Sequence, residues 1–176
     1  MKKLLFLLPL AALLLTMSCE KILDLLEFSV EDSQTITVPA TLPIGQFFAL
    51  PSVAVSSTSK TTYANNNTSA DYVQDVTLSR LALTITSPTG QNFDFLKRIE
   101  VYISTDANSQ GVLLASLNPV PTGATTIELT PADQKLDVFL SQGSYTLTTK
   151  VEVTQPLTQQ VTIRADSRFK VKAKPL

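Results

Sequence analysis

Apolar and polar residues alternate with a period of two along most of this chain. The alternation is longest near the end, from Ser144 to Val153 and again from Gln159 to Ala173. Successive side chains of a β-strand point to opposite faces, so this pattern predicts strands with one buried and one solvated face. The final segment predicts one long strand, or two strands with a bend near Asp166.

Six shorter segments predict further strands, at residues 34–38, 47–55, 76–85, 99–103, 112–117 and 125–129. The segment 47–55 is apolar enough to be buried, and its Pro51 predicts two short pieces or a bulge, because proline cannot donate to a strand ladder. Val76 and Leu78 are out of phase with the apolar residues that follow them. This phase change predicts a β-bulge near Ser79 and Arg80.

One segment carries the signals of a helix. Thr130 is a suitable N-cap, Pro131 a suitable first residue, and Gly143 stands where a helix commonly ends. Apolar residues between them are spaced to share one helix face: Leu136, Phe139 and Leu140. We therefore expect one short helix near residues 131–141.

The stretch 56–71 is polar, rich in asparagine and almost without large aliphatic residues. It predicts an exposed connection that closes with a helical turn near residues 69–74. A loop of this length is unusual inside a compact domain. A binding loop and a seam between sub-domains are therefore alternatives to a plain connection.

The first 19 residues form a separate unit. Two lysines precede an apolar run from Leu4 to Leu15, and small or polar residues lead to Cys19, the only cysteine. These features predict a secretory signal, and the run is short of the roughly 20 apolar residues that a membrane span needs. Ordinary secretion and an uncleaved anchor remain alternatives.

The order of these features resembles a bacterial lipoprotein signal. The resemblance implies that residues 1–18 are removed and that Cys19 becomes the lipidated first residue, so that the protein is held at a membrane. Glu20 follows the cysteine where an aspartate would favour the inner membrane, which implies the outer membrane for this protein. The sequence leaves open whether it lies on the periplasmic or the surface face.

The strand pattern predicts an all-β fold, a two-sheet antiparallel β-sandwich of immunoglobulin-like type with one short helix. We expect a lipidated tether at residues 19–33 and a single domain at 34–176. The stretch LTITSP (83–88) and the following FDFLKRIEVYIS (93–104) resemble segments of uncharacterised β-sandwich lipoproteins of the Bacteroidota. That resemblance implies the same fold and brings no established activity.

Composition excludes several kinds of chemistry. The chain has no histidine, which removes the commonest general base and any histidine-ligated metal. A lipidated Cys19 cannot act as nucleophile, metal ligand or disulfide partner. Without residues 1–18 the chain keeps 12 basic and 15 acidic residues, a net charge of about −3, which does not favour nucleic acid. We expect no enzyme activity, no cofactor, no metal and no small-molecule ligand.

Two surface features are candidates for partner binding. Five basic residues share the polar face of the last strand: Arg164, Arg168, Lys170, Lys172 and Lys174. They would suit lipid headgroups, lipopolysaccharide phosphates or an acidic protein, although lysines also protect a terminal strand from edge-to-edge pairing. Tyr102, on the polar face of its strand, is the best single candidate for stacking on a glycan.

A calcium loop is a further alternative at Asp106, which with Asn108 and Gln110 imitates the start of such a loop. Leu117 stands at the twelfth position, where that loop needs a glutamate. The function that fits these features is a non-catalytic, lipid-anchored envelope protein, a structural or accessory domain with an envelope protein as partner. The alternative is a glycan- or lipid-binding module at the outer membrane.

The lipoprotein hypothesis makes a direct prediction about the mature protein. We expect the N-terminal mass of protein isolated from its native membrane to correspond to an acylated Cys19, because the signal before it resembles that of a lipoprotein. Mass spectrometry of the N-terminal peptide measures this. An unmodified N-terminus would contradict the lipoprotein assignment.

Overall fold

The computed structural model describes residues 25–176. The signal at residues 1–18 and the lipidation site at Cys19 lie outside the described residues. Within the described part, the helices are all too short or too polar to cross a bilayer.

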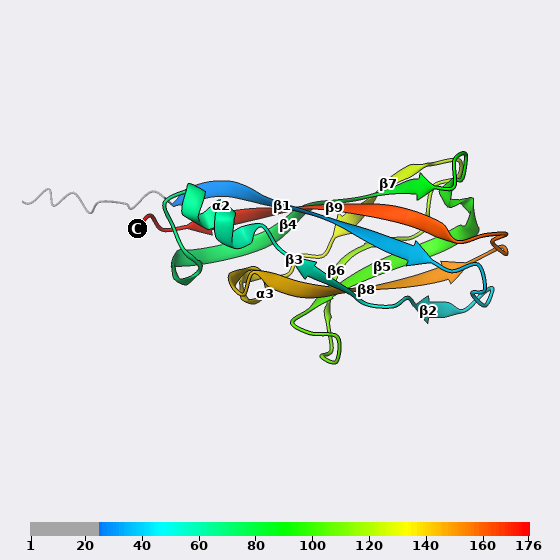
Figure 1. Cartoon of the computed structure of the whole chain (residues 1–176), viewed down its shortest axis with the longest axis horizontal. Coiled ribbons are helices and arrows are strands. Elements are labelled where there is room, and N and C mark those ends of the chain that lie inside the picture. Colours follow the sequence, from blue (N-terminus) through cyan, green and yellow to red (C-terminus); the bar gives the residue numbers. More distant parts are fainter. Residues whose placement is uncertain (1–24) are drawn as a thin grey trace, which may run out of the picture.

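Nine strands form one antiparallel sheet in the order β1-β9-β4-β7-β6-β5-β8-β2, and β3 pairs with β8 beside β2 (Figure 1). Their bounds are β1 Leu26–Val38, β2 Phe47–Ala49, β3 Val53–Ser56, β4 Val73–Ser87, β5 Leu96–Ser104, β6 Val112–Leu117, β7 Thr126–Pro131, β8 Ser144–Val153 and β9 Val161–Ala173. Two short α-helices, α2 (Ser59–Asn65) and α3 (Asp137–Ser141), lie toward the end at which β1 begins. The 3₁₀ turns are η1 (Ala70–Tyr72) and η2 (Phe93–Phe95).

The all-β, antiparallel architecture is confirmed, but the predicted two-sheet immunoglobulin-like sandwich is not. β7 pairs with β4 through residues 126–129 and with β6 through Thr130 and Pro131. β7 therefore links the β1-β9-β4 half of the sheet to the half that contains β6, β5 and β8. The sheet is continuous and curled. The half that contains β1, β9 and β4 faces the half that contains β5 and β8 (Figure 1).

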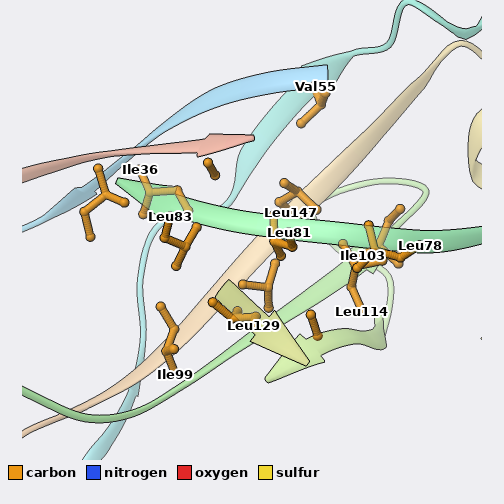
Figure 2. Packing of buried hydrophobic residues seen from close by; sticks show 14 of the residues in the cluster. Ile36, Val55, Leu78, Leu81, Leu83, Ile99, Ile103, Leu114, Leu129 and Leu147 are labelled. Atoms are coloured by element: carbon orange, nitrogen blue, oxygen red, sulfur yellow. The ribbon is translucent and has the colours of Figure 1, made fainter. Parts of the chain in front are cut away.

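The hydrophobic core lies between the two halves (Figure 2). Leu81 and Leu83 of β4 enter it from one side, and Ile99, Ile103 and Leu147 enter it from the other. All five side chains are almost fully buried. Burial of a leucine or isoleucine side chain stabilises a fold by about 1.5–3 kcal/mol, so this shared cluster holds the halves together.

The long strands have the predicted phase. β8 spans Ser144–Val153, and β9 runs unbroken from Val161 to Ala173 with alternating burial. The register between β4 and β9 shifts between Leu78 and Arg80, which confirms the predicted bulge. Pro51 separates β2 from β3, as its position predicted.

The first strand begins earlier than predicted. β1 starts at Leu26, and its pairing with β9 continues without a shift from Leu26 opposite Ala173 to Val38 opposite Val161. Residues 26–33, assigned above to the tether, are therefore part of the sheet. Phe28 and Val30 alternate with polar residues there, but Asp32 interrupts the apolar phase and hides it.

The helix predicted near residues 131–141 is shorter and begins only at Asp137. Thr130 and Pro131 do not cap it, because they pair with Ser116 and Ala115 as the end of β7. The segment is then tied to β4 by two hydrogen bonds: the Leu136 N–H donates to the Val76 carbonyl, and the Val76 N–H donates to the Asp137 carboxylate. Gly143 follows the helix with a φ of 74°, as predicted for that glycine.

The polar stretch 56–71 is more ordered than predicted. It contains α2, which the sequence did not indicate, and η1, which lies within the predicted turn at 69–74. Ser59 is fully buried and donates its hydroxyl to the Leu140 carbonyl, while Tyr63 packs edge-on against Phe28 with ring centroids 6.0 Å apart. Contacts with β1 and α3 therefore fix a helix that its own composition does not favour.

A buried aspartate joins four parts of the fold. Asp32, only 6% exposed, points inward from β1 and accepts hydrogen bonds from the Tyr145 hydroxyl at 2.9 Å and the Thr58 N–H at 2.8 Å. The Ser167 hydroxyl donates to the Asp32 carbonyl at 3.1 Å. Burial, together with the charge of Asp32, raises the pKa of Tyr145, so this phenol stays protonated as a donor.

We predict that Tyr145→Phe lowers the free energy of unfolding by about 1–3 kcal/mol, because it removes one of the two donors to a buried carboxyl group. Tyr102→Phe is the matched control: it deletes a hydroxyl at the surface and should change stability by about 0.5 kcal/mol or less. Urea denaturation followed by circular dichroism measures both. Equal effects of the two variants would contradict the structural role of Asp32.

Candidate functional site

The five predicted basic residues lie together along the outer face of the β1-β9-β4 half. Four stand on β9 and Lys174 follows it directly. Three of the five form ion pairs with acidic residues: Arg164 Nε with Asp166 at 2.8 Å, Arg168 Nε with Glu31 at 2.8 Å, and Lys170 with Glu27. We call these five residues the basic stripe. Because three of them are paired with acidic residues, the stripe is a charge-balanced surface over most of its length.

The middle of this surface is hollowed. A hollow of about 440 Å³ is lined by residues of both charges and by serines: Glu31, Asp32, Ser33, Arg80, Asp166, Ser167 and Arg168. Arg80 is itself paired with Glu128 at 3.2 Å. It stands at the bulge of β4, which locally disrupts the ladder to β9. The hollow thus offers paired charges, which suit neither an anion nor a cation alone.

Asp166 is the acidic residue inside the stripe. Its Oδ1 accepts a hydrogen bond from the Ser33 hydroxyl at 2.7 Å, and its Oδ2 accepts one from Arg164 Nε at 2.8 Å. Partial burial acts to raise the pKa of Asp166, but the two hydrogen bonds and the charge of Arg164 outweigh it and lower the pKa below its ordinary value.

Tyr102 lies in a different place, on β5 in the opposite half of the sheet (Figure 1). Its hydroxyl donates to Glu100 Oε2 at 2.6 Å, and Lys150 Nζ sits 4.5 Å from the centre of its ring. The hydrogen bond to Glu100 comes first among the causes that raise the pKa of Tyr102. The structure therefore does not bring Tyr102 together with the basic stripe.

A second hollow, of about 280 Å³, lies beside Tyr102. Its walls include Lys150, the hydrogen-bonded hydroxyls of Ser52 and Thr148, which are 2.8 Å apart, and the loop that ends at Gly111. Hydroxyls, an ammonium group and an aromatic ring are groups that bind sugars. One face of the Tyr102 ring, however, is taken by Lys150.

The Asp106 carboxylate forms hydrogen bonds within its own loop. Asp106 Oδ1 accepts hydrogen bonds from the N–H groups of Asn108 at 2.7 Å and Ser109 at 2.9 Å. The Asn108 bond is the first of the causes that lower the pKa of Asp106. A hairpin turn thus accounts for these residues, and among residues 25–176 no three His, Cys, Asp or Glu side chains gather as metal ligands would.

An uncovered apolar edge, formed by Ile44 and Phe48, is a surface that the sequence did not predict. Ile44 is 52% exposed and bridges to Val153, and Phe48, in β2, is 43% exposed. Phe48 is paired with the fully buried Val151 and so shares the inner face of the sheet, but β2 is the last strand and leaves it uncovered. The segment 47–55 was predicted to be buried from its apolar composition. That composition does not show that β2 is the last strand of the sheet.

Comparison with known proteins adds no assignment: neither protein-family models nor curated proteins match the chain. Three surfaces of the described residues are candidates for a functional site. Of these, the apolar edge is unpartnered, the basic stripe is mostly paired, and the Tyr102 hollow is polar.

The geometry of the stripe predicts a measurable change in titration. Arg164→Gln should raise the pKa of Asp166 toward its ordinary value near 4, because the variant loses a charged donor. Carboxyl NMR titration of both proteins measures the shift. Arg98→Gln is the control, since Arg98 pairs with Glu152 in the other half and should leave Asp166 unchanged.

Because the folded pKa of Asp166 is lowered, the stability that its contacts provide is present above the unfolded pKa and is lost as the pH falls through the folded pKa. The Arg164→Gln variant should therefore lose less stability than the wild type between neutral and acidic pH. An unaltered titration of Asp166 in this variant would show that the ion pair does not form in solution.

Proposed function

We propose that this protein is a lipid-anchored component of the bacterial outer membrane, a non-catalytic domain that works by contact with another envelope protein. The lipoprotein-like signal and Cys19 support the anchor. The absence of histidine and the structural use of the buried Asp32 side chain support a role without catalysis. The apolar edge at Ile44 and Phe48 supports the contact, and it is the observation that carries this proposal.

An exposed apolar edge on a rigid scaffold suits a protein partner for two reasons. Apolar side chains that are half-exposed before binding gain free energy when a partner covers them, and Phe is enriched at the centre of interfaces. The backbone of β2 is also free on its outer side, because β2 is the last strand of the sheet. A partner can therefore cover Phe48 and add hydrogen bonds along the same edge.

Neighbouring residues extend this surface. A hollow of about 250 Å³ separates β1 from β3 and is lined by hydroxyl and apolar side chains: Thr35, Thr37, Pro39, Pro51, Ser52 and Val53. Pro39 and Pro51 remove two backbone donors, which discourages unspecific strand pairing along this seam. The surface thus combines an apolar edge with protection against self-association.

A glycan-binding module is the second candidate, and the hollow beside Tyr102 is the observation that favours it. Thr148 and Lys150 are donors for sugar hydroxyls there, next to Tyr102. The two candidates use opposite kinds of surface. A protein partner needs the apolar edge, whereas a glycan needs the polar hollow.

The test is photo-crosslinking in the native membrane. A benzophenone amino acid at position 48 should capture one envelope protein, which also co-purifies in fixed ratio with the unmodified protein. The same amino acid at Val112, an exposed apolar residue at the start of β6, is the matched control and should capture little.

Equal capture from the two positions would contradict the assignment of the apolar edge. An acylated protein that co-purifies with nothing would favour the glycan or lipid alternative. In that case Tyr102→Ala should abolish binding to the glycan, and Phe48→Ser should leave that binding intact.

A further inference from the structure

The described chain begins close to the proposed lipid anchor. Five residues lie between Cys19 and Leu25, and even a fully extended chain spans only about 20 Å over these six steps. Leu25 directly precedes β1, whose first residue pairs with Ala173 at the end of β9. If Cys19 carries lipid, the end of the molecule that holds both Leu25 and the end of β9 must stay close to the bilayer.

This end of the molecule carries exposed apolar side chains. Leu25 is 44% exposed, and Tyr72, at the end of η1, is 42% exposed. Leu176 is also exposed. A tyrosine has an apolar ring and a polar hydroxyl, and this combination favours the headgroup layer of a membrane.

Backbone hydrogen bonds make this end a rigid surface. The Lys174 N–H donates to the Tyr72 carbonyl at 2.9 Å, and the Leu176 N–H donates to the Asn67 carbonyl at 3.0 Å. The Thr68 hydroxyl donates to the Lys174 carbonyl at 2.7 Å. The exposed side chains are therefore presented in fixed positions.

The charges at this end also fit a headgroup layer. Lys172 and Lys174 form no ion pair within the described part of the chain, unlike the other three members of the stripe. Asp71 and Asp75 lie on the same end, so the local charge is mixed. Phospholipid headgroups with a phosphate and an ammonium group are also mixed, and lysine side chains can extend to the phosphates.

A hollow of about 280 Å³ lies next to η1, and its lining includes Lys60, Tyr63, Thr68 and Asp71. The Tyr63 side chain is buried, and its hydroxyl has no hydrogen-bond partner among the described residues. Burial, with the charges of Asp137 and Asp32, raises the pKa of Tyr63 to about 12, so this hydroxyl remains an unused donor. The hollow next to η1 thus carries a cation, Lys60, and an anion, Asp71.

We infer that the end formed by Leu25, Tyr72 and Lys174 is seated in the headgroup layer of the bilayer that holds the lipid anchor. This inference rests on the proposed lipidation of Cys19. It orients the molecule: its long axis points away from the membrane, and β2 with the apolar edge stands at the far end (Figure 1). The lipid surface and the protein partner thus meet opposite ends of the domain.

Two matched probes test the orientation. Tyr72→Cys and Phe48→Cys replace aromatic residues of equal exposure at opposite ends of the molecule, and each is labelled with a polarity-sensitive fluorophore. Cys19 is the only native cysteine, so in the acylated protein the introduced thiol is the only one to react. The full-length acylated protein is reconstituted in vesicles of phosphatidylethanolamine and phosphatidylglycerol that contain a nitroxide lipid.

We expect quenching at position 72 to be several times stronger than at position 48. Leu25→Cys gives an independent probe of the same end and should behave like position 72. Thermal unfolding of each labelled variant confirms that the fold is retained.

The outcomes separate the two proposals. An unacylated Cys19, seen by mass and by labelling of two thiols, overturns the proposed anchor and this inference with it. An acylated protein in which positions 72 and 48 are quenched alike overturns the orientation alone. Strong quenching at 48 and weak quenching at 72 would reverse the orientation and contradict the inference.

Discussion

The ladder on both sides of β9 is the constraint on which the rest of this structure depends. β9 pairs with β1 over all thirteen of its residues and with β4 over nearly the same length. Because register fixes which face every side chain occupies, this ladder sets the inner row that contains Phe169 and the outer row that contains Arg168. It also fixes the end of the molecule at which β1 begins.

Asp32 and its partner Ser167 are polar residues on the buried face of that ladder, and the Asp32 side chain explains how the two halves are joined near α2. A carboxyl group in a core is costly unless donors surround it. Here Tyr145 of β8 and Thr58, from the segment before α2, donate to the carboxyl group, and Ser167 of β9 donates to the Asp32 backbone carbonyl. The hydrogen bonds that satisfy Asp32 therefore also hold the opposite half of the sheet and the polar stretch 56–71 against β1.

The two ends of the molecule differ in ways that suit a tethered contact domain. One end combines the start of β1, a clamped chain terminus and the exposed ring of Tyr72. The other presents Phe48 on the inner face of the last strand, where the described chain leaves it 43% exposed. Between the two ends, ion pairs balance most of the positive charge on the outer surface of β9. Most residues of the basic stripe, which is conspicuous in the sequence, thus have acidic neighbours in the fold.

Most β-strands and their phase could be predicted from the sequence alone, because alternation of apolar and polar residues is a local property. Residues 144–153 and 161–173 were predicted almost to the residue, and so was the bulge beside Arg80. Only the tertiary structure decided which strands are neighbours. It placed acidic Glu27 and Glu31 beside the basic stripe, separated Tyr102 from that stripe, and left Phe48 uncovered at the end of the sheet. The ion pairs and the place of Phe48 depend on contacts between residues more than a hundred positions apart, and a local pattern carries no information about such contacts.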